Sequence, residues 1–157
     1  MKFSFGHVLT SWFAVAALFV AMLSSGTAQA ENTQIRAHHV ALQVNSDDPV
    51  AMKHAVSNSM NLIRNYRENG EPIQIEIVAY GPGIAMFRSD ISPVREILDY
   101  IHSNIPEISF TMCGSTKAII EKREGHKLPL IEGTQVVPFG IVRLVELQET
   151  GWSYIRP

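Results

Sequence analysis

The strongest constraint on the fold is a regular alternation of strand-like and helix-like segments between His38 and Ile155. The strand-like segments are short runs of β-branched and other apolar residues that end at turn residues. The helix-like segments repeat apolar residues at a spacing near 3.6. We predict strands at residues 38–44, 73–80, 108–112, 134–137 and 152–155, and helices at residues 49–68, 92–105, 115–124 and 141–151. This order predicts a single α/β domain with a mostly parallel sheet of about five strands and helices on both faces, because right-handed crossovers place the helices there.

Several segment ends have the residues that such ends require. Asp48 can accept backbone N–H bonds as an N-cap, and Pro49 suits the first position of a helix, where no N–H group is needed. Ser115 or Thr116 can cap the third predicted helix, and Gly125 suits its end.

The first 30 residues have the features of a secretory signal peptide. Lys2 gives a positive start, residues 8–23 form an apolar stretch, and residues 28–30 read Ala-Gln-Ala, a small-x-small cleavage site. We expect cleavage after Ala30, a mature domain at residues 31–157, and a periplasmic or secreted protein. The alternative is an uncleaved membrane anchor, although the stretch is short for the roughly 20 residues of a span. No later stretch is long and apolar enough, so we expect no stable membrane span after cleavage.

Composition and charge exclude several classes of protein. The chain is 46% hydrophobic and 18% charged, which is typical of one globular domain. Its net charge is -2 and it has no basic run, so nucleic acid is not an expected partner. His38 and His39 are adjacent in a predicted strand and point to opposite faces, so no metal site is predicted. Arg143 and Glu146, on the last predicted helix, are interpreted as a solvated pair.

Cys113, the only cysteine, is the main candidate for chemistry. Alone it forms no intramolecular disulfide and no cysteine-rich zinc site. It is predicted to lie between a strand and a helix, at the carboxyl edge of the sheet, where ligand sites form in α/β proteins. A helix N-terminus favours the thiolate, and Lys117 is near enough to the start of this helix to add positive charge. The alternative is that Cys113 is simply a small buried hydrophobic residue.

Other residues are predicted to surround this cysteine. Gly81 and Gly83 form a turn at the same edge of the sheet and, with Gly114, are expected to wall its pocket. The dinucleotide-binding fingerprint would need a further glycine where Met86 stands, so no cofactor is expected. His126, in the loop beyond the cysteine helix, could act on the thiol as a base or charge partner, or could be an ordinary solvated histidine.

Four segments together resemble a known family. They are N-x-D-D-P at residues 45–49, YGPG at 80–83, FTMCGST at 110–116, and a tail at 137–157 that ends in L-Q-E-x-G-W-x-Y-I-x-P. This set resembles the DsrE/DsrF-like family of sulfur-relay proteins, and the resemblance covers residues 37–157.

The resemblance implies a small α/β fold with a five-stranded, mostly parallel sheet, assembly into homo- or hetero-oligomers, and a cysteine that carries sulfane sulfur as a persulfide. The position that matches the sulfur-carrying cysteine is Cys113. We therefore expect an exported sulfur carrier or sulfurtransferase-like protein without a cofactor, whose partners are sulfur donors and acceptors. The alternative is a non-catalytic binding or assembly module whose helices and Trp152-bearing tail form an oligomer interface.

Overall fold

The alternating segments form a five-stranded sheet in which every strand pairs in parallel with its neighbours. The computed structural model describes residues 37–157, and the predicted signal peptide lies outside the described residues. The strand order is β4-β3-β2-β1-β5. The strands are β1 (His38–Val44), β2 (Ile73–Ala79), β3 (Ile108–Cys113), β4 (Thr134–Val137) and β5 (Ser153–Ile155). The α/β fold predicted from the sequence is therefore confirmed.

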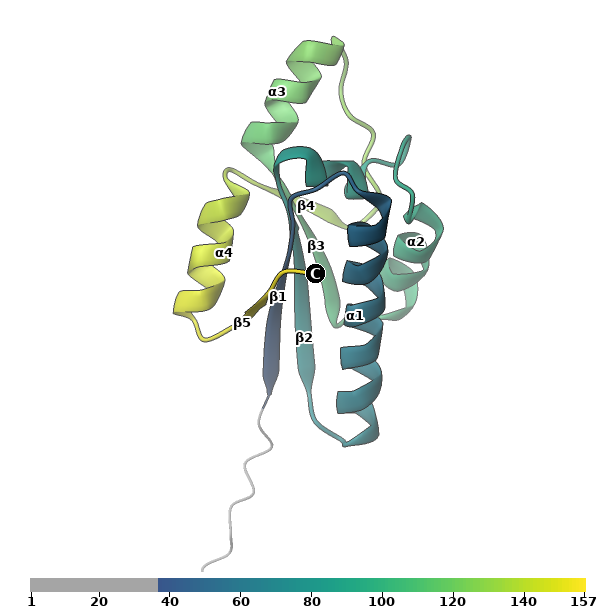
Figure 1. The fold of residues 1–157 in the computed structure, drawn as a ribbon, viewed down its shortest axis with the longest axis vertical. Coiled ribbons are helices and arrows are strands. Elements are labelled where there is room, and N and C mark those ends of the chain that lie inside the picture. Colours follow the sequence, from purple (N-terminus) through teal and green to yellow (C-terminus); the bar gives the residue numbers. More distant parts are fainter. Residues whose placement is uncertain (1–36) are drawn as a thin grey trace, which may run out of the picture. The chain divides into compact units, whose positions relative to one another are not determined.

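The helices cover the two faces of this sheet (Figure 1). They are α1 (Pro49–Glu68), η1 (Gly81–Phe87, a 3₁₀ helix), α2 (Arg95–Asn104), α3 (Gly114–Glu124) and α4 (Gly140–Glu149). In Figure 1, α1 and α2 lie on one side of the sheet and α4 on the other, while α3 extends beyond the upper end of the sheet. That end is where β1, β2 and β3 finish, so α3 stands at the carboxyl edge.

The main core lies between the sheet and the pair α1 and α2. Alternate residues of β2 point to this side, and they pack with the apolar stripes of both helices. Fully buried members of this cluster are Leu42, Met52, Ile75, Ile77, Leu98, Ile101 and Met112. This face is thus a continuous apolar layer.

The opposite face, under α4, has a much smaller apolar cluster. Its buried members are Ala41, Val78, Leu144 and Leu147, with Tyr80 and Trp152 packed at its margin. Glu76, also on β2, is only 5% exposed. The α4 face therefore combines a small apolar cluster with a buried charge.

Some element boundaries differ from those predicted. Asp48 caps α1 as expected, since its side chain accepts a hydrogen bond of 2.8 Å from the N–H of Val50. The next helix, α2, begins at Arg95 rather than at residue 92, because the hydroxyl of Ser92 donates to the carbonyl oxygen of Met86 at 2.6 Å and holds this turn outside the helix.

The glycine turn and the start of α3 also differ. The turn at residues 81–83 is the first part of η1. The N-cap position of α3 is occupied by Cys113 itself, not by Ser115 or Thr116. The cap of α3 thus lies at least two residues earlier than the sequence pattern indicates, at the cysteine itself.

The two adjacent histidines point to opposite faces, as predicted. The ring of His38 stacks on Tyr66 of α1 with a centroid distance of 4.0 Å, whereas His39 meets Trp152 at 5.1 Å. Within residues 37–157, no group of three or more His, Cys, Asp or Glu side chains is arranged to hold a metal ion.

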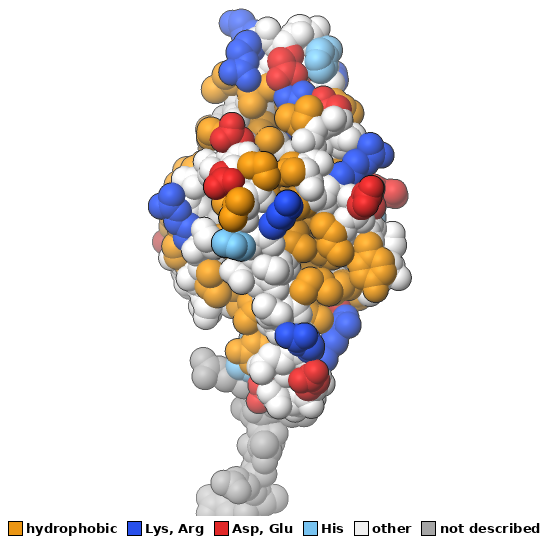
Figure 2. Space-filling view, turned by 45° about the vertical axis from the view of Figure 1, so that its right-hand side comes forward, with side chains coloured by type: hydrophobic (Ala, Val, Ile, Leu, Met, Phe, Trp, Pro, Cys, Tyr) orange, Lys and Arg blue, Asp and Glu red, His pale blue; other side chains and the backbone are white. Residues whose placement is uncertain are grey.

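The surface mixes charged and apolar side chains. Figure 2 shows acidic and basic side chains scattered among hydrophobic ones on the face that it presents. None of the helices between residues 37 and 157 is both long enough and apolar enough to cross a bilayer.

Candidate functional site

Cys113 is the last residue of β3 and the residue from which α3 starts. Along β3, side chains alternate between the two faces, so Phe110 and Met112 enter the main core while Thr111 and Cys113 point toward α4. The cysteine is 5% exposed and forms no disulfide. It therefore lies at the carboxyl edge of the sheet, as predicted, but nearly covered.

Two helices begin beside this thiol. One is α3, which starts at Gly114, and the other is α4, which starts at Gly140. A Cβ atom built on Gly140 would lie 3.1 Å from the Cβ atom of Cys113, so the start of α4 is in direct contact with the cysteine. Helix N-termini present free N–H groups and positive partial charge, and both favour a thiolate.

The chemical environment lowers the pKa of the Cys113 thiol. Burial raises this pKa. Hydrogen bonds from the backbone N–H of Gly140 and from the hydroxyl groups of Ser115 and Thr116 lower it by more, so that the pKa is about 7. The Sγ atom of Cys113 and the Oγ atom of Ser115 are 3.3 Å apart. Because the thiolate is the nucleophilic form of cysteine, a pKa near 7 gives this thiol a large nucleophilic fraction at neutral pH.

Of the three glycines predicted to wall the pocket, Gly81 and Gly114 lie close to this site and Gly83 does not. The N–H of Gly81 donates to the Oγ1 atom of Thr116 at 3.2 Å, which ties the turn after β2 to the first turn of α3. A Cβ atom on Gly114 would lie 2.9 Å from the carbonyl oxygen of Val137, so this glycine allows β4 to approach the start of α3. Gly83 instead serves the packing of η1 on the end of β1.

Lys117 and His126 are not brought to the thiol. The ammonium group of Lys117 pairs with Glu121, one turn further along α3, and so points away from Cys113. His126 follows the far end of α3, which at about 1.5 Å per residue is more than 15 Å from the cysteine. Its ring lies 3.5 Å from a carboxylate oxygen of Glu124.

Two residues of the site were missed by sequence reasoning. Gly140 supplies a backbone donor to the thiol, and Tyr80 lies on its other side, with its Cβ atom 3.1 Å from a Cβ atom built on Gly140. The phenol of Tyr80 accepts a hydrogen bond of 2.7 Å from Gln43, which is in turn bonded by Tyr154. The signal for Gly140 was present, because it follows a predicted strand just as Gly114 does.

The interpretation of Arg143 and Glu146 as a solvated pair is confirmed only in part. These two side chains do approach to 3.6 Å, but the guanidinium of Arg143 makes two shorter bonds, of 2.9 and 2.8 Å, to the carboxylate of Glu76. The hydroxyl of Thr111 donates to the same carboxylate at 2.7 Å. The hydrogen bonds that Arg143 donates to Glu76 raise the pKa of its guanidinium above the usual value.

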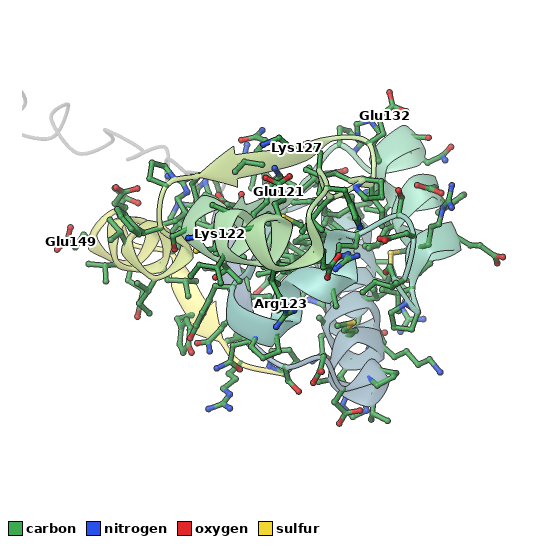
Figure 3. All side chains as sticks on the ribbon, turned by 90° about the horizontal axis from the view of Figure 1, so that it is seen from above. Glu121, Lys122, Arg123, Lys127, Glu132 and Glu149 are labelled. Carbon is green, nitrogen blue, oxygen red and sulfur yellow. The ribbon has the colours of Figure 1, made fainter. Side chains whose placement is uncertain are left out.

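A groove of about 460 Å³ lies between η1 and α3. It is lined by Asp47, Pro82, Ile84, Ala85, Arg88, Ile91, Thr116, Ile120, Arg123 and Glu124. Figure 3, which looks down on the carboxyl edge, shows Arg123 on the η1 side of α3 and Glu121 with Lys127 on the opposite side. Cys113 does not line this groove.

Comparison with known proteins supports the fold. No family model matches the sequence, and a search of curated proteins finds no significant match. Among solved structures, the chain is similar to MTH1491 from Methanobacterium thermoautotrophicum, with 29% sequence identity and a TM-score of 0.65. The match covers 76% of this chain and 99% of that protein, which is described as a protein of unknown function. The similarity therefore extends over the whole of the archaeal domain and brings no activity with it.

Proposed function

We propose that this protein is an exported sulfur carrier of the DsrE/DsrF-like type, in which Cys113 holds a sulfane sulfur atom as a persulfide. The observation that carries the proposal is the position of the thiol between the starts of α3 and α4, where the N–H of Gly140 and the Ser115 hydroxyl favour the thiolate. The quoted sequence motifs, which include the cysteine turn, support the same role.

The transfer consists of two displacements at sulfur. The Cys113 thiolate attacks the sulfane sulfur of a donor such as thiosulfate, a new S–S bond forms, and the electron pair of the broken S–S bond leaves with sulfite. An acceptor thiolate then attacks the outer sulfur of the persulfide, and Cys113 leaves as a thiolate. Atoms and electrons balance without an added oxidant, so no cofactor is required.

The hydrogen-bond donors that stabilise the thiolate would also stabilise the persulfide anion that forms from it. A persulfide anion, like a thiolate, carries negative charge, and preorganised N–H and O–H groups stabilise such charge better than water does in a covered site. With only 5% of the cysteine exposed, transfer requires a donor to reach the sulfur through this opening or after a small movement of α3. No residue of α3 is fully buried, so such a movement would expose little apolar surface, but it would break the ion pair of Glu124 with Arg88.

Mass spectrometry of the intact protein tests this proposal. Reduced protein is incubated with thiosulfate or polysulfide, and we expect an adduct of one sulfur atom that a reductant removes and that Cys113→Ser does not form. Ser115→Ala is a suitable companion variant, because it keeps the cysteine and should form the adduct more slowly at neutral pH. If no adduct forms although the thiol reacts with a small alkylating agent, the carrier role is wrong.

A second candidate is a non-catalytic assembly module, and exposed apolar side chains on and around α4 favour it. Ile141, Val142 and Val145 on this helix are each about half exposed, as are Phe139 and Val136 just before it. We propose that a second copy of the chain covers these side chains. An Ile141→Lys/Val145→Lys variant should then sediment as a smaller species than the parent protein, and an alkylation-resistant Cys113 would favour the module over the carrier.

Export is also part of the proposal. It is supported by the charge, apolar stretch and cleavage site of residues 1–30. The intact mass of protein recovered from a cell that can export it should correspond to a chain that begins at Glu31. A mass that includes residues 1–30 would instead indicate a retained anchor.

A further inference from the structure

The ion pair between Glu76 and Arg143 has no part in the transfer chemistry described above, yet it is the most buried charge on the α4 side of the sheet. The carboxylate of Glu76 belongs to a residue that is 5% exposed, and it receives two bonds from Arg143 and one from Thr111. All of its strong partners are thus side chains from neighbouring elements, β3 and α4. A buried carboxylate held in this way fixes the distance between those elements.

The pair lies directly below the candidate thiol. Thr111 is two residues before Cys113 in β3, on the same face, so their Cα atoms are about 7 Å apart. On the helix side, Arg143 is one turn after Gly140, and its backbone N–H closes the first turn of α4 by bonding to the carbonyl oxygen of Phe139 at 3.1 Å. The ion pair and the Gly140 donor therefore belong to the same helical turn.

We propose that the Glu76–Arg143 ion pair is a positioning device that holds the first turn of α4 against Cys113 and thereby sets the reactivity of its thiol. The use of that reactivity for sulfur transfer rests on the proposed function, but the positioning itself does not. Arg143 and Glu76 touch neither the sulfur nor a substrate, and they act through the backbone of Gly140.

The reason for an ion pair here is geometric. Apolar contacts under α4 involve only four buried residues, and such contacts allow a helix to slide or tilt. A buried ion pair often adds little net stability compared with apolar residues of the same size, but its two parallel hydrogen bonds permit a single arrangement. The titratable groups on this side of the sheet are His39 of β1, Glu76 of β2, Tyr80 just after β2, Tyr154 of β5, and Arg143 and Glu146 of α4. Lys117 of α3 is directed to Glu121.

The test is the pH dependence of the alkylation rate of Cys113 in full, reduced protein. We would compare Glu76→Ala, Arg143→Met and the double variant Glu76→Met/Arg143→Met with the parent chain. The matched control is Arg67→Met, which breaks another bidentate arginine–glutamate pair, with Glu107, beside the start of β3 at the opposite edge of the sheet. Circular dichroism checks that each variant is folded.

The positioning role and a simple charge effect predict changes of opposite sign in the pKa of the Cys113 thiol when Glu76 is replaced. If the pair acts only through its charges, loss of Glu76 leaves a cation that lowers the thiol pKa, and loss of Arg143 leaves an anion that raises it. If it positions Gly140, both single variants and the neutral double variant raise the pKa. For a rise of about one unit from a pKa near 7, the thiolate fraction and the alkylation rate at pH 7 fall about fivefold.

We expect that fall in all three variants and no change in Arg67→Met. Arg143→Met leaves the buried carboxylate of Glu76 without its partner and can therefore fail to fold. The double variant removes both charges and so avoids this cost. A folded double variant with the parent pKa, or a lowered pKa in Glu76→Ala, would overturn the proposal. Because alkylation needs no sulfur donor, the positioning inference survives if the parent protein alkylates normally but takes up no sulfur.

Discussion

Gly140 lies so close to Cys113 that a Cβ atom at position 140 would be 3.1 Å from the Cβ atom of the cysteine, and also 3.1 Å from that of Tyr80. Contacts at this distance are tighter than van der Waals contact between carbon atoms, for which about 3.5–4.0 Å is optimal. The absence of a side chain therefore lets the backbone N–H of Gly140 reach the thiol. The donor that most lowers the pKa of Cys113 depends on this close approach.

A methyl group at position 140 should weaken this hydrogen bond. In Gly140→Ala, the start of α4 must move away from both neighbours, so the pKa of Cys113 should rise from about 7 toward the usual value for cysteine, and alkylation at pH 7 should slow severalfold. Gly151→Ala, just beyond the other end of α4, is the control: nothing lies within 4 Å of a Cβ atom there, and the strain from its φ of +89° falls at the end of α4 away from the thiol. An equal slowing in both variants would contradict the assigned role of Gly140.

Gly83 should be among the least replaceable residues of the fold. A Cβ atom there would lie 2.2 Å from the carbonyl oxygen of Val44, and this backbone cannot shift without disturbing the end of β1. We expect Gly83→Ala to lower the free energy of unfolding by about 3 kcal/mol, as for other overpacked sites. Gly125→Ala, which has open space but a φ of +76°, should cost only about 1 kcal/mol. Urea unfolding of the two variants measures the difference, and equal losses would count against the close contact.

The stability of the domain should decrease in acid, in part through Glu121. Its hydrogen bonds with Lys117 and the N–H of Leu128, together with Lys127, lower the pKa of the Glu121 carboxyl to about 2. The folded state therefore binds this proton less readily than the unfolded state, whose glutamate pKa is about 4.3. The stabilisation is complete above that value and is lost as the pH falls toward 2.

Glu121→Gln should accordingly reduce the acid dependence of the unfolding free energy between about pH 5 and pH 2. The control is Glu149→Gln, at the exposed end of α4. Chemical unfolding at a series of pH values provides the measurement. An acid slope that is the same in Glu121→Gln and in the parent protein would show that these contacts do not hold the carboxylate in solution.

Arg88 should contribute more to stability than most surface arginines. Its side chain is 8% exposed and lies 2.7 Å from carboxylate oxygens of both Asp90 and Glu124. In Arg88→Met these two carboxylates lose their common partner, and we expect a loss of about 2–3 kcal/mol, below the usual cost of breaking a fully buried pair. Arg95→Met breaks a half-exposed pair with Asp99 and should cost less than about 1 kcal/mol. Thermal unfolding measures both variants, and equal losses of stability in Arg88→Met and Arg95→Met would contradict this prediction.

The features that the sequence predicts well are those decided locally. The bounds of β1 and β4 are as expected, and α1 begins at its predicted cap, because strand-forming runs and capping residues act over a few positions. Cys113 could be placed at the carboxyl edge for a similar reason, since each strand of a parallel sheet ends at the same side.

The features that the sequence does not predict depend on which elements meet in space. The pair between Glu76 and Arg143 joins β2 to α4, and neither residue's neighbours in the chain indicate the other. The spacing of Lys117 from Cys113 suggested a charge partner, but Glu121 lies within reach one turn further along the same helix and takes the ammonium group instead. Contacts within a single helix thus redirected a side chain that was expected at the site.

The absence of buried residues in α3 has a consequence for how this protein could diverge. Substitutions on the outer side of that helix, such as at Ile119, would leave the interior intact, whereas changes in β3 just before it would not. Evolution could therefore remodel the surroundings of one sulfur atom, and with them the molecules admitted to it, while keeping the scaffold unaltered.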